Sequence, residues 1–112
     1  MNIYSKKDEN ILLHIINKKN NIKERLDLTP NSTNLQVSYI NNVKNKKCRP
    51  HKHLEVERNT NSTSECWIVI RGKINIELYD IDDSMLINEI LEQGDCLITF
   101  QGGHSYISLE DN

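Results

Sequence analysis

Two histidines separated by one residue, His51 and His53, are the side chains whose type and spacing could most directly do chemistry. Side chains alternate between the two faces of a β-strand, so two imidazoles at this spacing on an extended strand point to the same side. A carboxylate and a third imidazole from neighbouring strands could complete a metal site. Nitrogen and oxygen donors without a cysteine suit a divalent first-row ion such as iron, manganese, nickel or zinc. The sequence therefore predicts one such ion bound by three of the four histidines and one glutamate: His51, His53, His104 and Glu65.

Length, charge and cysteine content limit the classes of function. A chain of 112 residues is expected to form one domain with a single core. A net charge of -2 argues against nucleic-acid binding through a basic patch. The apolar stretch at residues 11–16 is too short to cross a bilayer, and nothing resembles a signal peptide. Three cysteines, an odd number without an export signal, predict reduced thiols in the cytoplasm.

Residues 1–33 differ in pattern from the rest of the chain. The apolar residues between positions 5 and 19 follow the i, i+1, i+4, i+5 spacing of an amphipathic helix: Ile11, Leu12, Ile15 and Ile16. Ser5 followed by Asp8 resembles a helix capping box. We therefore predict a short N-terminal α-helix and a linker over residues 1–33, with His14 a packed or surface residue.

Residues 34–112 show the pattern of short β-strands. An alternating segment at 35–40 is followed by apolar runs at 67–70, 74–79, 85–91, 96–100 and 106–109, which turn residues separate. Strands of this length with turns every 8–12 residues indicate an all-β sandwich or barrel. The segment 58–64 has no apolar residue, so it is expected to be an exposed loop.

The first group of candidate residues resembles the first motif of the cupin family, G(X)5HXH(X)3–4E(X)6G. His51-Lys52-His53 matches the HXH part, and Glu65 through Gly72 matches E(X)6G, although eleven residues separate the two parts. Glu57 stands at the shorter family spacing, but neither an apolar strand nor a glycine turn follows it. Glu65 is therefore the preferred carboxylate ligand and Glu57 the alternative.

The second cupin motif, G(X)5PXG(X)2H(X)3N, is matched more loosely. Gly94, Gly102 and His104 fit it, with His104 one residue early. Phe100 stands where the family has proline, and Ser108 where it has asparagine.

The resemblance implies a fold and an assembly. It implies a cupin-type double-stranded β-helix, a jelly-roll barrel, over residues 34–112, preceded by the N-terminal helix within a single domain. Cupin barrels usually have further strands after the last histidine. With an end at Asn112, we expect either that the closing strand is missing or that a partner chain covers the open edge. We expect a homodimer in which the edge at 35–40 or at 106–109 pairs with its symmetry mate.

Within the family, the chain resembles small bacterial cupins associated with lipopolysaccharide and capsule sugar biosynthesis, through residues 49–53, 65–72 and His104. This resemblance implies a metal-binding protein that acts on or binds a sugar or sugar nucleotide in surface-polysaccharide metabolism, with isomerase-like, epimerase-like or other metal-dependent chemistry. A non-catalytic, metal-stabilised carbohydrate-binding domain and an Fe(II) dioxygenase are the alternatives.

Enzyme status stays open at this point. Strand parity alone offers three candidates for an ionisable or polar group in the cavity, and none is a convincing general base: Gln36, Tyr39 and Tyr106. Trp67 shares a face with Glu65 and would either line the cavity or fill the core. Four basic residues could hold a substrate phosphate, although each alone is more often a solvated charge: Arg49, Lys52, Arg58 and Arg71.

Overall fold

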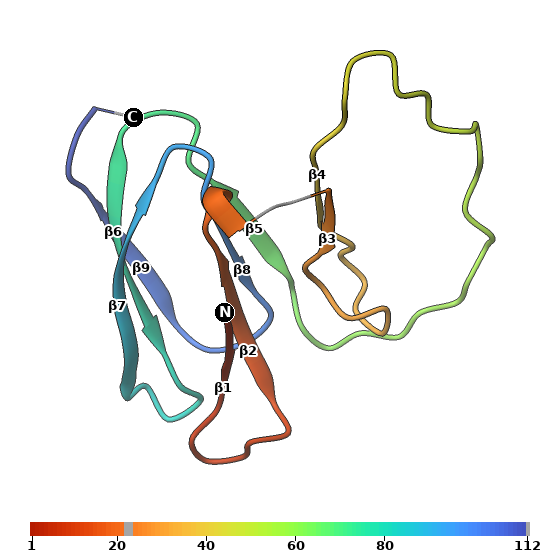
Figure 1. The fold of residues 1–112 in the computed structure, drawn as a ribbon. Coiled ribbons are helices and arrows are strands. Elements are labelled where there is room, and N and C mark those ends of the chain that lie inside the picture. Colours follow the sequence, from red (N-terminus) through yellow and green to blue (C-terminus); the bar gives the residue numbers. More distant parts are fainter. Residues whose placement is uncertain (22–23, 112) are drawn as a thin grey trace. The chain divides into compact units, whose positions relative to one another are not determined.

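The computed structural model describes residues 1–21 and 24–111 (Figure 1). The chain divides into two compact units, one formed by Met1–Asn21 with Ser62–Asn112 and the other by Ile22–Asn61. Among the described residues there is no helix with the length and apolarity needed to span a bilayer.

The larger unit contains two antiparallel sheets. The first has the order β1-β2-β8-β5, and the second has the order β7-β6-β9. Their strands are β1 (Asn2–Tyr4), β2 (Leu12–Asn17), β5 (Glu65–Ile68), β6 (Lys73–Tyr79), β7 (Met85–Glu92), β8 (Cys96–Thr99) and β9 (His104–Ser108), and a short 3-10 helix, η1 (Lys19–Asn21), follows β2.

The hydrophobic core of the larger unit is filled from both sheets. Buried side chains of the first sheet and of the residue after β5 contact buried side chains of β6 and β7: Ile3, Ile16, Leu97 and Val69 with Ile74, Ile76, Leu78 and Leu91. The two sheets therefore pack face to face, as the two layers of strands in Figure 1 show. Along β6 every second residue is buried, as the alternating sequence predicts.

The smaller unit contains one two-stranded sheet. Its strands β3 (Arg25–Asp27) and β4 (Ser38–Ile40) pair antiparallel, with Leu26 opposite Tyr39. No strand is formed between residues 41 and 61, so this part of the chain is a long irregular segment.

The all-β class is confirmed, and five of the predicted strands are found close to their expected bounds. Each sheet of the larger unit ends in separate edge strands, and the described residues do not close into a barrel. The segment 58–64 lies outside the strands, as predicted.

The predicted N-terminal helix is wrong, because that part of the chain forms β1 and β2. Strand β2 lies between β1 and β8, and five of its six residues are buried. A strand buried on both faces has a continuous apolar run, and over so few residues this run cannot be told from a helical stripe. The Ser5 and Asp8 signal marks a turn instead, since the Ser5 hydroxyl accepts hydrogen bonds from the backbone N–H groups of Lys7 and Asp8 at 3.0 and 3.3 Å.

Candidate functional site

A row of polar side chains crosses the inner face of the first sheet. Glu65 on β5 and His14 on β2 both lie directly opposite Thr99 on β8. Residues directly opposite one another share a face of the sheet. The next row on this face contains the core residues Ile16 and Leu97. The polar row therefore lies at one end of the core.

Glu65 meets His104 from the second sheet. The Nε2 atom of His104 lies 3.2 Å from Oε2 of Glu65, and the indole N–H of Trp67 donates to the same oxygen at 3.2 Å. The Trp67 ring also stands edge-on to the rings of His104 and Tyr106, with centroids 4.9 and 5.3 Å apart. The structure thus brings together two of the predicted ligands and holds the carboxylate from two sides.

The two ring nitrogens of His104 have different surroundings. A carboxylate only accepts, so His104 donates its Nε2–H to Glu65. The Nδ1 atom of His104 is buried and has no hydrogen-bond partner among the described residues. Imidazole nitrogen and carboxylate oxygen are ligand types that first-row divalent ions accept. A metal bound between them would take the place of the Nε2 proton, so the two residues fit a metal in type once that proton is released.

His51 and His53 lie in the smaller unit, in the exposed segment without strands. The strand expected at the His-x-His segment is not formed there, but the two rings stack with centroids 5.7 Å apart and an interplanar angle of 27°. The Nδ1–H of His51 donates to the carbonyl of Arg49 at 3.1 Å. This bond leaves the lone pair on Nε2 available, and metal-binding histidines commonly have such a partner. Glu57 lies in the same exposed segment.

The four predicted ligands therefore form two pairs, one in each unit. Within residues 1–21 and 24–111, no group of three or more histidine, cysteine, aspartate or glutamate side chains gathers as a metal site.

The sequence did not indicate how His14 is used. Its side chain is fully buried, with Nδ1 3.1 Å from the Thr99 hydroxyl and Nε2 3.0 Å from the Tyr79 carbonyl oxygen. A carbonyl only accepts, so Nε2 is protonated, and in the neutral ring the Thr99 hydroxyl donates to Nδ1. Burial lowers the pKa of His14, the nearby His104 adds to this, and the Tyr79 carbonyl and Asp80 oppose it. His14 is thus a neutral structural residue beside the candidate ligands.

This burial predicts a loss of stability in acid. Unfolded His14 has a pKa near 6.5 and takes up a proton as the pH falls through that value, whereas the folded residue does so only at a lower pH. The free energy of unfolding should therefore fall as the pH is lowered from 7.5 to 5, by up to about 1.4 kcal/mol per pH unit from this residue. Urea unfolding at both pH values measures it.

The control for this prediction is His14→Gln, which keeps a donor for the Tyr79 carbonyl but does not titrate. The variant should show a flatter dependence of stability on pH than the natural protein. Because the other histidines are present in both proteins, the comparison isolates the effect of His14 together with its interaction with His104. Equal pH dependence in the two proteins would contradict the buried neutral state of His14.

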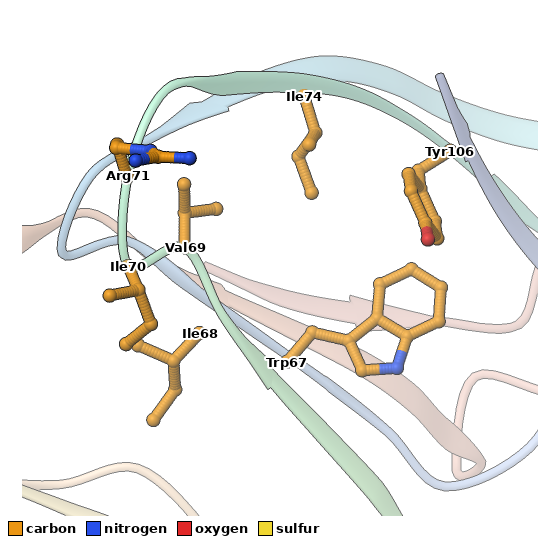
Figure 2. Close-up of a pocket in the computed structure, with 7 residues that line it drawn as sticks. All are labelled: Trp67, Ile68, Val69, Ile70, Arg71, Ile74 and Tyr106. Carbon is orange, nitrogen blue, oxygen red and sulfur yellow. The ribbon is translucent and has the colours of Figure 1, made fainter. Parts of the chain in front are cut away.

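A pocket of about 630 Å³ lies next to the Glu65–His104 pair, because Trp67 belongs to both. Its walls come from β5 and the turn after it, from β6 and from β9: Trp67, Ile68, Val69, Ile70, Arg71, Ile74 and Tyr106 (Figure 2). Trp67 thus has two roles, since it orients the glutamate with its N–H and lines a pocket with its ring.

The cysteines show no sign of an activated nucleophile. Burial raises the pKa of the Cys66 thiol, and a hydrogen bond with Cys96 opposes this only partly. Cys96 is buried and Cys48 is exposed, and no disulfide joins the three. Thiol groups with a raised pKa are poor nucleophiles.

Comparison with known proteins identifies no relative. No protein-family model matches the chain, and neither a curated protein nor a solved structure does so.

Proposed function

We propose that this protein is a metal-binding domain of the cupin type, with Glu65 and His104 as ligands and with His51 and His53 as the further ligands that the sequence motif predicts. The contact between Glu65 and His104 carries this proposal. The two residues are 39 positions apart in the sequence, come from different sheets, and place an oxygen and a nitrogen within 3.2 Å.

The path of the chain supports the cupin-type fold. From β5 in the first sheet the chain enters the β6–β7 hairpin of the second, returns as β8 beside β5, and then crosses again to place β9 beside β6. Alternation between two facing sheets is the pattern of double-sheet jelly rolls, the architecture to which cupins belong.

The open edges of the two sheets support the proposed homodimer, because each edge strand could pair with a strand of a second copy. Strands β5 and β9 are edge strands of their sheets. On β9, Tyr106 and Ile107 are exposed, and the strand has no lysine or proline to protect it from pairing. Pairing of β9 with its copy would use one surface twice and close the assembly.

The chemistry of the site follows from its donors. A bound divalent ion supplies a Lewis acid that polarises an oxygen of a small ligand. Glu65 and the imidazoles would hold the ion, and Trp67 fixes the orientation of Glu65 through its N–H. The resemblance to sugar-biosynthesis cupins supports a sugar or sugar nucleotide as the ligand. The odd number of cysteines supports a cytoplasmic place of action. A binding domain without catalysis is the second candidate, because none of the described side chains at the site stands as a clear general base.

Metal analysis tests the proposal. Protein purified without a chelating column should contain about one divalent first-row ion per chain, and the double variant His53→Ala/His104→Ala should contain only background metal, because two of the four ligands are lost. Glu57→Gln is the matched control and should keep the ion. Full metal content in the double variant would overturn the site. Loss of metal in Glu57→Gln but not in Glu65→Gln would assign the carboxylate ligand to Glu57.

A further inference from the structure

The pocket beside Trp67 has a composition that differs from that of a sugar site. Six of its seven lining residues are aliphatic or aromatic, and Arg71 is the exception. Every hydroxyl of a sugar that leaves water needs a hydrogen-bond partner, or its burial costs free energy. Side chains of isoleucine and valine offer no such partner, so the walls favour a ligand with an apolar body.

The volume and the aromatic walls fit a small organic molecule. About 630 Å³ lies within the range of pockets that enclose drug-sized ligands. Trp67 and Tyr106 meet edge-on with centroids 5.3 Å apart, and Val69 and Ile74 lie between these rings and Arg71 in Figure 2. A flat ring or a branched aliphatic group would contact both the aromatic and the aliphatic walls.

Arg71 supplies the single charge of the pocket. It follows β5 in the turn to β6, and within the part of the chain that the structure describes it makes no ion pair or hydrogen bond. The lysine two residues later differs, because Lys73 forms an ion pair with Glu92 at 3.1 Å. The guanidinium of Arg71 is therefore available to a ligand, and its planar donors match a carboxylate in a bidentate manner.

From the apolar walls and the available guanidinium, we propose that this pocket binds a small carboxylic acid with an aromatic or branched aliphatic body. The carboxylate pairs with Arg71, and the body packs against Trp67, Val69, Ile74 and Tyr106. This site goes beyond the proposed metal site, which it adjoins through Trp67, and it requires no metal.

The test uses 3-phenylpropionate as the acid and 3-phenylpropionamide as its neutral counterpart. Trp67 is the only tryptophan of the chain, so its fluorescence reports directly on the pocket. With EDTA present, the acid should change the emission in a saturable manner, and calorimetry should give the same dissociation constant. The amide, which lacks the charge, should bind at least about tenfold more weakly. Equal binding of acid and amide would overturn the proposal.

Two charge variants separate the guanidinium contact from general attraction of anions. Arg71→Gln should weaken binding of the acid at least about tenfold and leave binding of the amide unchanged. Lys73→Gln removes the same charge two residues further along the chain, at the start of β6, and should leave both unchanged. An equal loss in the two variants, or no loss in Arg71→Gln, would overturn the assignment.

A second copy of the chain is the competing occupant of the pocket. If it covers the pocket, Trp67 emission without any acid will change with protein concentration as the mass measured by light scattering doubles, and the acid will not bind. That result would overturn the small-acid site. All of these measurements are made with EDTA, so they test acid binding whether or not the protein binds a metal. Failure of the metal proposal is therefore distinguishable from failure of the acid-binding proposal.

Discussion

Replacing Ile76 by alanine is expected to lower the free energy of unfolding by about 2–5 kcal/mol. Ile76 is 0% exposed at the centre of β6 and belongs to the core cluster between the two sheets. Removing its side chain leaves a cavity that packed neighbours on both sheets cannot fill. Urea unfolding followed by circular dichroism measures the loss.

The matched control is Ile107→Ala on the adjacent strand. Ile107 lies opposite Asn75, on the other face of the second sheet, and is 64% exposed. Its truncation should change the free energy of unfolding by less than about 0.5 kcal/mol. Because a register shift of one residue would exchange the two faces of a strand, the pair of variants tests the register directly. A larger loss at Ile107 than at Ile76 would contradict it.

The strands from β5 to β9 could be predicted from the sequence because their local pattern agrees with their environment. Strand β6 alternates buried and less buried residues, and Gly72, Gly94 and Gly102 have positive φ in the turns that the sequence indicated. Strand β2 could not be predicted, since it is buried on both faces and its alternation is lost. Secondary structure was therefore predictable where a strand alternates, as in β6, or where glycine turns mark its two ends, as in β8, which is also buried throughout.

Tertiary contacts that join distant segments were beyond the sequence pattern. In the sequence, Asp80 is one of several polar residues between the apolar runs 74–79 and 85–91. In the structure it is 0% exposed and accepts hydrogen bonds from the Ser5 hydroxyl and the Lys6 N–H at 2.6 and 2.7 Å. Burial alone would raise the pKa of this carboxyl, but these bonds, with one from the Ile81 N–H, hold it below its usual value. Nothing local marks Asp80 as different from its exposed neighbour Asp82, because the difference lies in a partner 75 residues away.

For the candidate site, the motif placed Glu65 and His104 among the ligands, and the structure brings the two side chains within 3.2 Å at the starts of β5 and β9. Metal binding by this pair stays a prediction. The motif did not indicate that Trp67 would bind the glutamate or that His14 would lie in the same polar row. Both facts depend on cross-strand register between β2, β8 and β5, which a single sequence does not specify. The joint use of His51 and His53 with this pair stays a prediction.

Gly102→Ala is expected to destabilise the protein by about 2–5 kcal/mol, the sum of left-handed backbone strain and steric overlap. Gly102 has φ of +82°, and a Cβ atom there would lie 2.4 Å from the Tyr79 carbonyl oxygen and 3.1 Å from Nε2 of His14. These two atoms form the hydrogen bond that holds His14, so no movement of a flexible side chain relieves the overlap. The turn also leads directly into His104, and metal binding should weaken together with stability.

Gly103→Ala is the control that separates this overlap from a general loss of glycine. Gly103 does not have a positive φ, and its added Cβ would lie 3.3 Å from Cβ of Tyr79, a tight contact that a small shift relieves. Alanine lowers the conformational entropy of the unfolded chain relative to glycine, and the stability gained in this way offsets the cost of the tight contact. The free energy of unfolding should therefore stay within about 1 kcal/mol of that of the natural protein. Urea unfolding of both variants decides between steric overlap at position 102 and a general effect of replacing a glycine in this turn. Similar losses at Gly102 and Gly103 would show that the Tyr79 carbonyl does not approach position 102 as described, and would remove the structural reason for a neutral His14 beside His104.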